Sequence, residues 1–325
     1  MTITEIAQLA DVSKACVSRY FNHGYVSEEK KEKIRKVIEA TGYTPSRGNQ
    51  AAAEKSPTIG IVIPKINSES ISRMVSGISQ VLNQKGYRML LADTENDVEK
   101  ELQYLKSFQQ DELAGIIFSA TILTEEHFRL LQAMRIPVVI LSQEVDGFSC
   151  VFHDDYGAAA AMTEQLIRHG HKKIGAIMVT ANDRAAGNAR MQAYRDTLLK
   201  HQLDFSEKHV AYSEFSLESG YDAAQKLLEQ APDLDGIVCA TDTIAIGAMQ
   251  YLKGIGKRIP QDIGITGIGH SRMTEIVEPN LTTTHLFYKS TGIEGADMLV
   301  KMIETGIDMK KKLKMGFEVI EQETC

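Results

Sequence analysis

Apolar positions recur at helical spacing over the first 45 residues and predict three short helices. Ile6 and Ala10 lie on one face of the first. The third opens at the carboxylates after Ser27, ends at Gly42 and cannot continue past Pro45. Three short helices of this length predict a small all-α head at the N-terminus.

A tight turn joins the first two of these helices. Asp11 lies where the chain must reverse, and Asp tolerates a left-handed backbone better than most residues. Ser13 is placed to cap a second helix over 14–21, which turns Val17 and Phe21 inward at i, i+4. Two short helices around such a turn, braced by a third, predict a helix-turn-helix unit.

From Pro57 onward the pattern changes to apolar strands that alternate with amphipathic helices. The first strand is expected over 58–63 and the last clear one over 264–266, with a helix after almost every strand between them. Such alternation over more than 200 residues predicts parallel sheets covered by helices. The expected fold is therefore the all-α head followed by an α/β body.

Charge and composition are those of an ordinary globular protein with an uneven charge distribution. The net charge is −7 over 325 residues, but residues 1–55 hold 9 basic and 7 acidic side chains against 27 and 36 in the remainder. This asymmetry favours nucleic acid as a partner of the head only mildly. No run of apolar residues is long enough to span a membrane and no secretory signal is visible, so we expect a cytoplasmic protein with four reduced cysteines.

The second helix exposes small and cationic side chains on one face: Lys14, Ala15, Ser18 and Arg19. Residues of this kind enter a major groove and contact bases or phosphates. From spacing alone two interpretations stay open, namely a DNA-binding head or a three-helix bundle with a solvated basic face.

The segment from Ile6 to Arg19, IAQLADVSKACVSR, resembles the signature of the lactose-repressor (LacI) family, I-A-x-x-A-G-V-S-x-x-T-V-S-R. Asp11 replaces the usual glycine and Cys16 the usual threonine. The resemblance implies a homodimer that binds double-stranded operator DNA, one recognition helix per half-site. The residues it assigns to the DNA are Thr2, Ser13, Lys14, Ala15, Ser18, Arg19, Asn22, Tyr43 and Arg47.

The resemblance continues through the body, in segments such as His169–Ile174 and Ala240–Ala248. It implies two doubly wound, parallel-sheet lobes like those of periplasmic sugar-binding proteins, with a small carbohydrate effector, a sugar or a sugar phosphate, between them. The expected domains are a head over 1–45, a hinge or linker over 46–56, and a body over 57–325. The first lobe would hold about 57–156 plus 285–312, and the second 157–284 plus 313–325.

By the same resemblance, Arg190 begins the family's R-x-x-G-[YF] motif, where an arginine fork can hold adjacent sugar hydroxyls. Phe215 and Tyr288 fall where the family carries aromatic residues over its ligand. Asp154, like Asp155, follows a strand end and could accept hydroxyl protons, while Asp242 fits a helix cap as well as a ligand. The full expected effector set is Ser70, Arg73, Asp154, Arg190, Phe215, Asp242, His270 and Tyr288.

Two departures from the family pattern point to a different ligand. The family's G-[FY]-D-D is Gly267-Ile268-Gly269-His270 here, so a ligand-binding carboxylate is missing at Gly269, with His270 as a candidate replacement. The usual N-P-F-F is replaced by residues 68–71, SESI, which makes the pocket floor more polar.

The linker departs from the family as well. The hinge pattern P-N-x-x-A-x-x-L is PSRGNQAA here, with Ala52 at the leucine position and Gly48 inside the segment. Glycine disfavours a helix, and alanine offers too little apolar surface to unstack a base step. We therefore expect residues 46–56 to act as a tether in the absence of DNA.

Two other classes of protein remain as alternatives. For an α/β enzyme, no GxGxxG, P-loop, GxSxG or HExxH motif is present, and His169 with His171 fits a solvated helix end better than a metal site. For a sugar receptor without a DNA role, the missing signal and the head both argue against it. We expect no catalytic residue, no cofactor and no metal.

Overall fold

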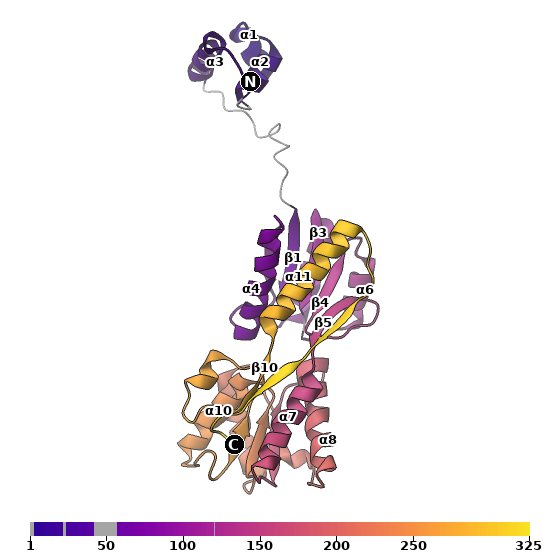
Figure 1. The fold of residues 1–325 in the computed structure, drawn as a ribbon, viewed down its shortest axis with the longest axis vertical. Coiled ribbons are helices and arrows are strands. Elements are labelled where there is room, and N and C mark those ends of the chain that lie inside the picture. The colour runs from indigo at the N-terminus through magenta and orange to yellow at the C-terminus, as the bar shows by residue number, and fades with distance from the viewer. Residues whose placement is uncertain (1–2, 22–23, 42–56, 120) are drawn as a thin grey trace. The chain divides into compact units, whose positions relative to one another are not determined.

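The structure is a computed structural model that describes residues 3–21, 24–41, 57–119 and 121–325. The chain forms two compact units, Met1–Ser56 and Pro57–Cys325 (Figure 1). The predictions for Thr2, Asn22, Tyr43, Arg47 and the linker 46–56 lie outside the described residues.

The head contains the three predicted helices, α1 (Ile3–Leu9), α2 (Lys14–Phe21) and α3 (Glu28–Thr41). Ile6, Val17 and Ile34 are fully buried where the three helices meet. Asp11 has a φ of 52°, the left-handed conformation expected at the turn. The Ser13 hydroxyl accepts the Cys16 N–H at 3.2 Å and so caps α2 as predicted.

The first lobe of the body is a six-stranded parallel sheet in the order β11-β5-β4-β3-β1-β2. The sheet has a hydrophobic core on each face, and neighbouring residues on β1 point to different cores. Ile61 packs with α4 and α11, while Val62 packs with α5 and α6. The strands are β1 (Thr58–Ile63), β2 (Arg88–Asp93), β3 (Leu113–Ser119), β4 (Val138–Leu141), β5 (Ser149–His153) and β11 (Lys312–Met315). The helices are α4 (Glu69–Gln84), α5 (Val98–Gln110), α6 (Glu125–Ala133) and α11 (Tyr288–Thr305).

The second lobe is a four-stranded parallel sheet in the order β7-β6-β8-β9, with one continuous core on its two faces. Its strands are β6 (Ile174–Met178), β7 (Val210–Tyr212), β8 (Gly236–Cys239) and β9 (Gly264–Thr266). Its helices are α7 (Asp155–Arg168), α8 (Arg190–Lys200), α9 (Leu217–Gln230) and α10 (Asp242–Gly254). Shorter turns are the π-helical η2 (Arg184–Ala189) and the 3-10 turns η3 (Glu207–His209) and η4 (Arg272–Glu275).

Three segments cross between the lobes (Figure 1). The chain passes from β5 directly into α7, and the antiparallel pair β10 (Thr283–Leu286) and β12 (Phe317–Ile320) carries the other two passages. The sequence placed residues 313–325 in the second lobe, and this is wrong for residues 313–315. These residues extend the first sheet beside β5, with Leu313 opposite Val151, so the last crossing follows Met315.

Several elements have no counterpart in the sequence interpretation: α6, β5, and after β9 also β10, α11, β11 and β12. β5 lies inside the sheet, between β11 and β4, and its five residues include a serine and a histidine. α6 begins at Thr124, whose hydroxyl forms a capping box with His127 in place of the usual acidic partner. Within the described part of the chain, no helix is both long and apolar enough to cross a bilayer.

Candidate effector cavity and nucleic-acid face

The exposed side of α2 carries the cationic residues that the sequence assigned to DNA. Lys14, Ala15 and Arg19 are exposed, as is Ser13 at the cap, while Ser18 is half-buried. The first turn of α2 holds no acidic residue, so no carboxylate there neutralises the positive end of the helix dipole. This face therefore has the shape and charge to meet a polyanion.

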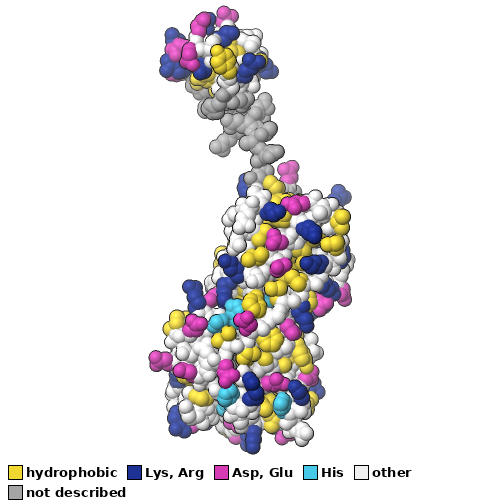
Figure 2. All heavy atoms as spheres, in the orientation of Figure 1, with side chains coloured by type: hydrophobic (Ala, Val, Ile, Leu, Met, Phe, Trp, Pro, Cys, Tyr) yellow, Lys and Arg dark blue, Asp and Glu magenta, His cyan; other side chains and the backbone are white. Residues whose placement is uncertain are grey.

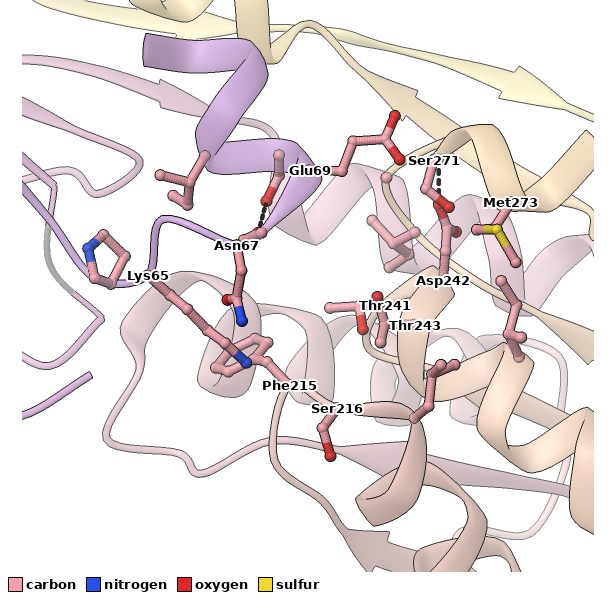
Figure 3. Close-up of a pocket in the computed structure, with 18 of the residues that line it drawn as sticks. Lys65, Asn67, Glu69, Phe215, Ser216, Thr241, Asp242, Thr243, Ser271 and Met273 are labelled. Carbon is pink, nitrogen blue, oxygen red and sulfur yellow. Dashed lines mark hydrogen bonds between the residues drawn. The ribbon is translucent and has the colours of Figure 1, made fainter. Parts of the chain in front are cut away.

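Between the two lobes of the body lies a cavity of about 440 Å³, here called the outer chamber. It opens at the N-terminal ends of α4, α9 and α10, which follow the carboxyl ends of strands in both lobes. Figure 3 shows Lys65 and Asn67 reaching in from the first lobe, opposite Phe215, Thr241 and other residues of the second.

A smaller cavity of about 130 Å³, the deep chamber, shares a wall with the outer chamber. Ser70, Phe215 and Tyr288 line both, so the two spaces adjoin and form one site. The residues that line only the deep chamber are mostly polar, and they include Gln143, His153, Asp155, Asp183 and Arg190.

Arg190 is the central charge of the deep chamber and is only 4% exposed. Its Nε and Nη2 donate to Asp155 Oδ1 at 2.9 and 2.6 Å, and Nη1 donates to the carbonyl of Ala240. A buried arginine held this rigidly presents its remaining donors in a fixed direction. Asp155 is thus the residue that orients the guanidinium.

Burial determines the protonation states of the titratable groups around Arg190. Burial raises the pKa of Tyr288 to about 12, so its hydroxyl stays protonated. Burial lowers the pKa of His153 to about 4, and its Nε2 lies 2.9 Å from Thr291 Oγ1. Burial raises the pKa of Asp183 to about 6, although the carboxylate accepts the N–H groups of Ala185 and Ala186. At neutral pH the chamber therefore offers the uncharged Tyr288 hydroxyl and His153 imidazole beside the Arg190–Asp155 ion pair and the mostly ionised carboxylate of Asp183.

Asp242 lies in the wall of the outer chamber, and burial raises the pKa of its carboxyl. One oxygen accepts the Ser271 N–H at 2.7 Å and the other accepts the Thr283 hydroxyl at 2.5 Å. The side chain that caps α10 is Thr241 rather than Asp242. Gly269, with a φ of 136°, passes close to this carboxylate, since a Cβ there would lie 3.2 Å from Asp242 Oδ2.

His270 does not take the place of the missing carboxylate. Its φ of 53° accompanies a side chain that points away from both chambers, into a side cavity of about 320 Å³. There Nδ1 lies 3.1 Å from His285 Nδ1, and Nε2 lies 3.2 Å from Glu275 Oε1. Figure 2 shows histidine side chains gathered on this face where the two lobes meet.

Asp154 is also outside both chambers. It accepts the Gly157 N–H at 3.2 Å as the cap of α7 and lies 3.5 Å from Lys314 Nζ. Strand β5 ends just before it, so neighbouring residues leave in different directions and Asp155 enters the site instead. Of the other expected residues, Ser70, Arg73, Phe215, Asp242 and Tyr288 line the outer chamber and Arg190 the deep chamber.

Sequence reasoning did not select several lining residues, among them Asn67, His153, Asp183, Ser216 and Thr241. A signal existed for Ser216 and Thr241, because each directly precedes a helix that follows a strand. Nothing local distinguished His153 or Asp183 from ordinary loop and strand residues.

Direct hydrogen bonds also connect the two lobes at a seam beside the outer chamber. Arg73 Nη1 of α4 donates to the His270 carbonyl at 2.9 Å, and both oxygens of Glu69 lie 3.2 Å from the Arg272 N–H. These contacts join the first lobe to the loop that also carries Gly269. Changes at the cavity therefore have a direct route to the lobe angle.

A helix-turn-helix head and a two-lobed α/β body with an inter-lobe cavity define a class of ligand-responsive, DNA-binding regulators. The family model for bacterial regulatory proteins of the lacI family matches residues 2–46. The model for periplasmic binding proteins and the sugar-binding domain of the LacI family matches residues 56–322. The chain belongs to the LacI family.

Individual relatives align along nearly the whole chain. The sucrose operon repressor of Staphylococcus xylosus is 30% identical over 303 residues, 93% of each protein. A solved transcriptional regulator CelR–cellobiose complex is 25% identical with a TM-score of 0.78, covering 100% of both chains. The transcription regulator CcpA of Lactococcus lactis is 28% identical with a TM-score of 0.77, over 83% of this chain and 99% of that one.

Proposed function

We propose that the protein represses a carbohydrate-utilisation operon and that a small carbohydrate in the inter-lobe cavity controls its affinity for operator DNA. The observation that carries this proposal is the cavity itself. Fixed donors and acceptors around Arg190, beside the aromatic rings of Phe215 and Tyr288, suit the hydroxyls and C–H faces of a sugar. The proposal assigns binding and no catalysis to this site, and places the protein in the cytoplasm.

The head would supply the DNA contacts. Lys14, Ala15, Ser18 and Arg19 would meet bases and phosphates in the major groove, with Ser13 at the start of the helix. Family membership and the absence of an acidic residue in the first turn of α2 support this assignment.

The working form would be a homodimer on a pseudo-palindromic operator. Strand β2 supports this because it is an edge strand, and its Met89 and Leu90 are 37% and 42% exposed. An edge strand with exposed apolar side chains is a surface that a second copy of the chain can cover.

A ligand in the cavity would change operator affinity through the seam of hydrogen bonds between the two lobes. A molecule held between α4 of the first lobe and α9 and α10 of the second changes the free-energy difference between lobe angles. The Arg73–His270 and Glu69–Arg272 contacts would then differ between the DNA-binding and the released form.

The experiment that tests the proposal is enrichment of double-stranded DNA from a random-sequence library on the full chain, followed by a mobility-shift titration. We expect one enriched, nearly palindromic sequence whose binding weakens with salt. Failure to enrich any sequence, or binding of all DNA with equal affinity, would contradict the proposal.

A further inference from the structure

We infer that the effector is an uncharged carbohydrate of two linked units, one in the deep chamber and one in the outer chamber, and not a sugar phosphate. The inference rests on the proposed function of this cavity and fixes the chemical class of its ligand. Three features of the site carry it: the charge of the lining, the way three helix ends are occupied, and the division into two chambers.

The lining is acidic. Among the described residues, the two chambers are lined by three basic and five acidic side chains. Arg190 is committed to Asp155, Arg73 donates to the His270 carbonyl and Glu69 accepts from Arg272, whereas Lys65 reaches into the cavity. A phosphate entering this space would meet more negative than positive charge, in a partly buried site where such repulsion is poorly screened.

Helix N-termini are the other means by which a protein binds phosphate, and three of them open into the outer chamber. Each already has a carboxylate in its first turn: Glu69 on α4, Glu218 on α9 and Asp242 on α10. These carboxylates interact favourably with the positive ends of the helix dipoles. These three helix ends are therefore already compensated; α11, which begins at Tyr288 in the wall of the chamber, has no acidic residue in its first turn.

The size and shape of the site favour more than one sugar unit. The deep chamber, at about 130 Å³, is smaller than the ~300 Å³ at which ordinary ligand sites begin, so a ligand that reaches Arg190 must also extend into the outer chamber of about 440 Å³. Phe215 and Tyr288 lie between the two spaces, where aromatic faces can pack against sugar rings.

Polar groups stand at both ends of this combined space. Arg190 and Asp155 serve the deep end, and Asn67, Ser216 and Thr243 serve the outer end (Figure 3). A single ring would satisfy one group of partners and leave the other in water.

The test is calorimetric titration of the full chain with three kinds of probe. The first is a set of neutral disaccharides (sucrose, trehalose, cellobiose, maltose and lactose), the second their monosaccharides, and the third trehalose 6-phosphate and glucose 6-phosphate. We expect at least one disaccharide to bind about tenfold or more tightly than its monosaccharides, and phosphorylation to weaken binding by a similar factor.

A variant then locates the second unit. Thr243 is exposed and lines only the outer chamber, so Thr243→Tyr should weaken the disaccharide about tenfold or more and leave monosaccharide binding unchanged. Thr305→Tyr, at an exposed position near the end of α11, is the matched control and should change neither.

Three outcomes would overturn the inference: tightest binding by a phosphorylated sugar, equal binding of a monosaccharide and its disaccharide, or no binding by any disaccharide in the set. Operator binding by the same preparation is measured separately. A chain that binds operator DNA but prefers a sugar phosphate would refute the ligand class and leave the proposed regulation intact. A chain that binds no DNA sequence specifically would refute the proposed regulation of an operon.

Discussion

At the scale of single residues, Arg190 has two roles that the sequence did not separate. It faces the deep chamber, and it also neutralises the buried carboxylate of Asp155 at 2.6 Å. The sequence located the arginine through its motif. It could not identify the partner, because Asp154 and Asp155 are equivalent until the direction in which the chain leaves β5 is known.

We predict that Arg190→Ala lowers the free energy of unfolding by about 3–5 kcal/mol, because it leaves Asp155 charged, buried and unpaired. The double variant Arg190→Ala/Asp155→Ala should be destabilised less than this single variant. Urea unfolding of both measures the difference. A double variant that is less stable than Arg190→Ala would show that the ion pair is not what the single substitution breaks.

A second residue-scale prediction concerns pH. His153 has a folded pKa of about 4 against an ordinary 6.5, so between these values the unfolded chain binds a proton that the native chain does not. Acidification through this window should therefore cost stability, by roughly 3 kcal/mol in full. His153→Asn should remove this part of the pH dependence in unfolding titrations from pH 7 to pH 4.

Asp183 provides a control, because its contribution to the pH dependence of stability has the opposite sign. Its folded pKa is raised to about 6, so the native chain holds a proton between pH 4 and 6 that the unfolded chain has lost. Stability from this group therefore falls as pH rises through that window, and Asp183→Asn should steepen the loss on acidification. Equal pH profiles for the unmodified chain and both variants would contradict these assignments.

At the scale of elements, periodicity predicted the helix-turn-helix and most of the alternating strands and helices. It succeeded at Asp11 and Ser13 because a turn and a cap are decided by local backbone chemistry. It failed at β11, where Lys312–Met315 is a short half-exposed edge strand with no strong pattern of its own. It also misplaced His270, because the direction of that side chain depends on a left-handed backbone that the residue type does not indicate.

We predict that Arg19→Ala on the exposed face of α2 weakens operator binding by about 1–3 kcal/mol if the side chain contacts a base. The matched control is Arg35→Ala on α3, whose guanidinium is exposed and paired with Glu32 at 2.7 Å. Mobility shifts at moderate salt compare the two variants. Equal affinity of Arg19→Ala and the unmodified chain would remove this residue from the interface.

At the scale of the whole molecule, two lobes and a cleft could be predicted only through family resemblance, because the crossings join segments far apart in the chain. Neither periodicity nor motif shows that the cavity has two chambers. That division arises from side chains of β5, α8, α11 and the loop before α9, which meet only in the folded body. For the same reason, the surface through which two copies would pair could not be located from the sequence.

We predict that Leu90→Glu shifts the protein from dimer to monomer and lowers operator affinity, because it places a charge on the exposed edge strand β2. Leu199→Glu is the control, since Leu199 is 54% exposed on α8 of the other lobe. Sedimentation velocity gives the oligomeric state. A Leu90→Glu protein that remains dimeric would exclude β2 from the interface.

The central claim is that the inter-lobe cavity controls DNA binding, and one titration tests it most directly. The affinity of the full chain for its enriched operator is measured with and without a saturating concentration of the tightest-binding carbohydrate. We expect a change of about 5–150-fold, the usual range of allosteric coupling. We also expect the reciprocal change in carbohydrate affinity when operator is bound. Operator affinity that does not change while the carbohydrate fills the cavity would contradict the account.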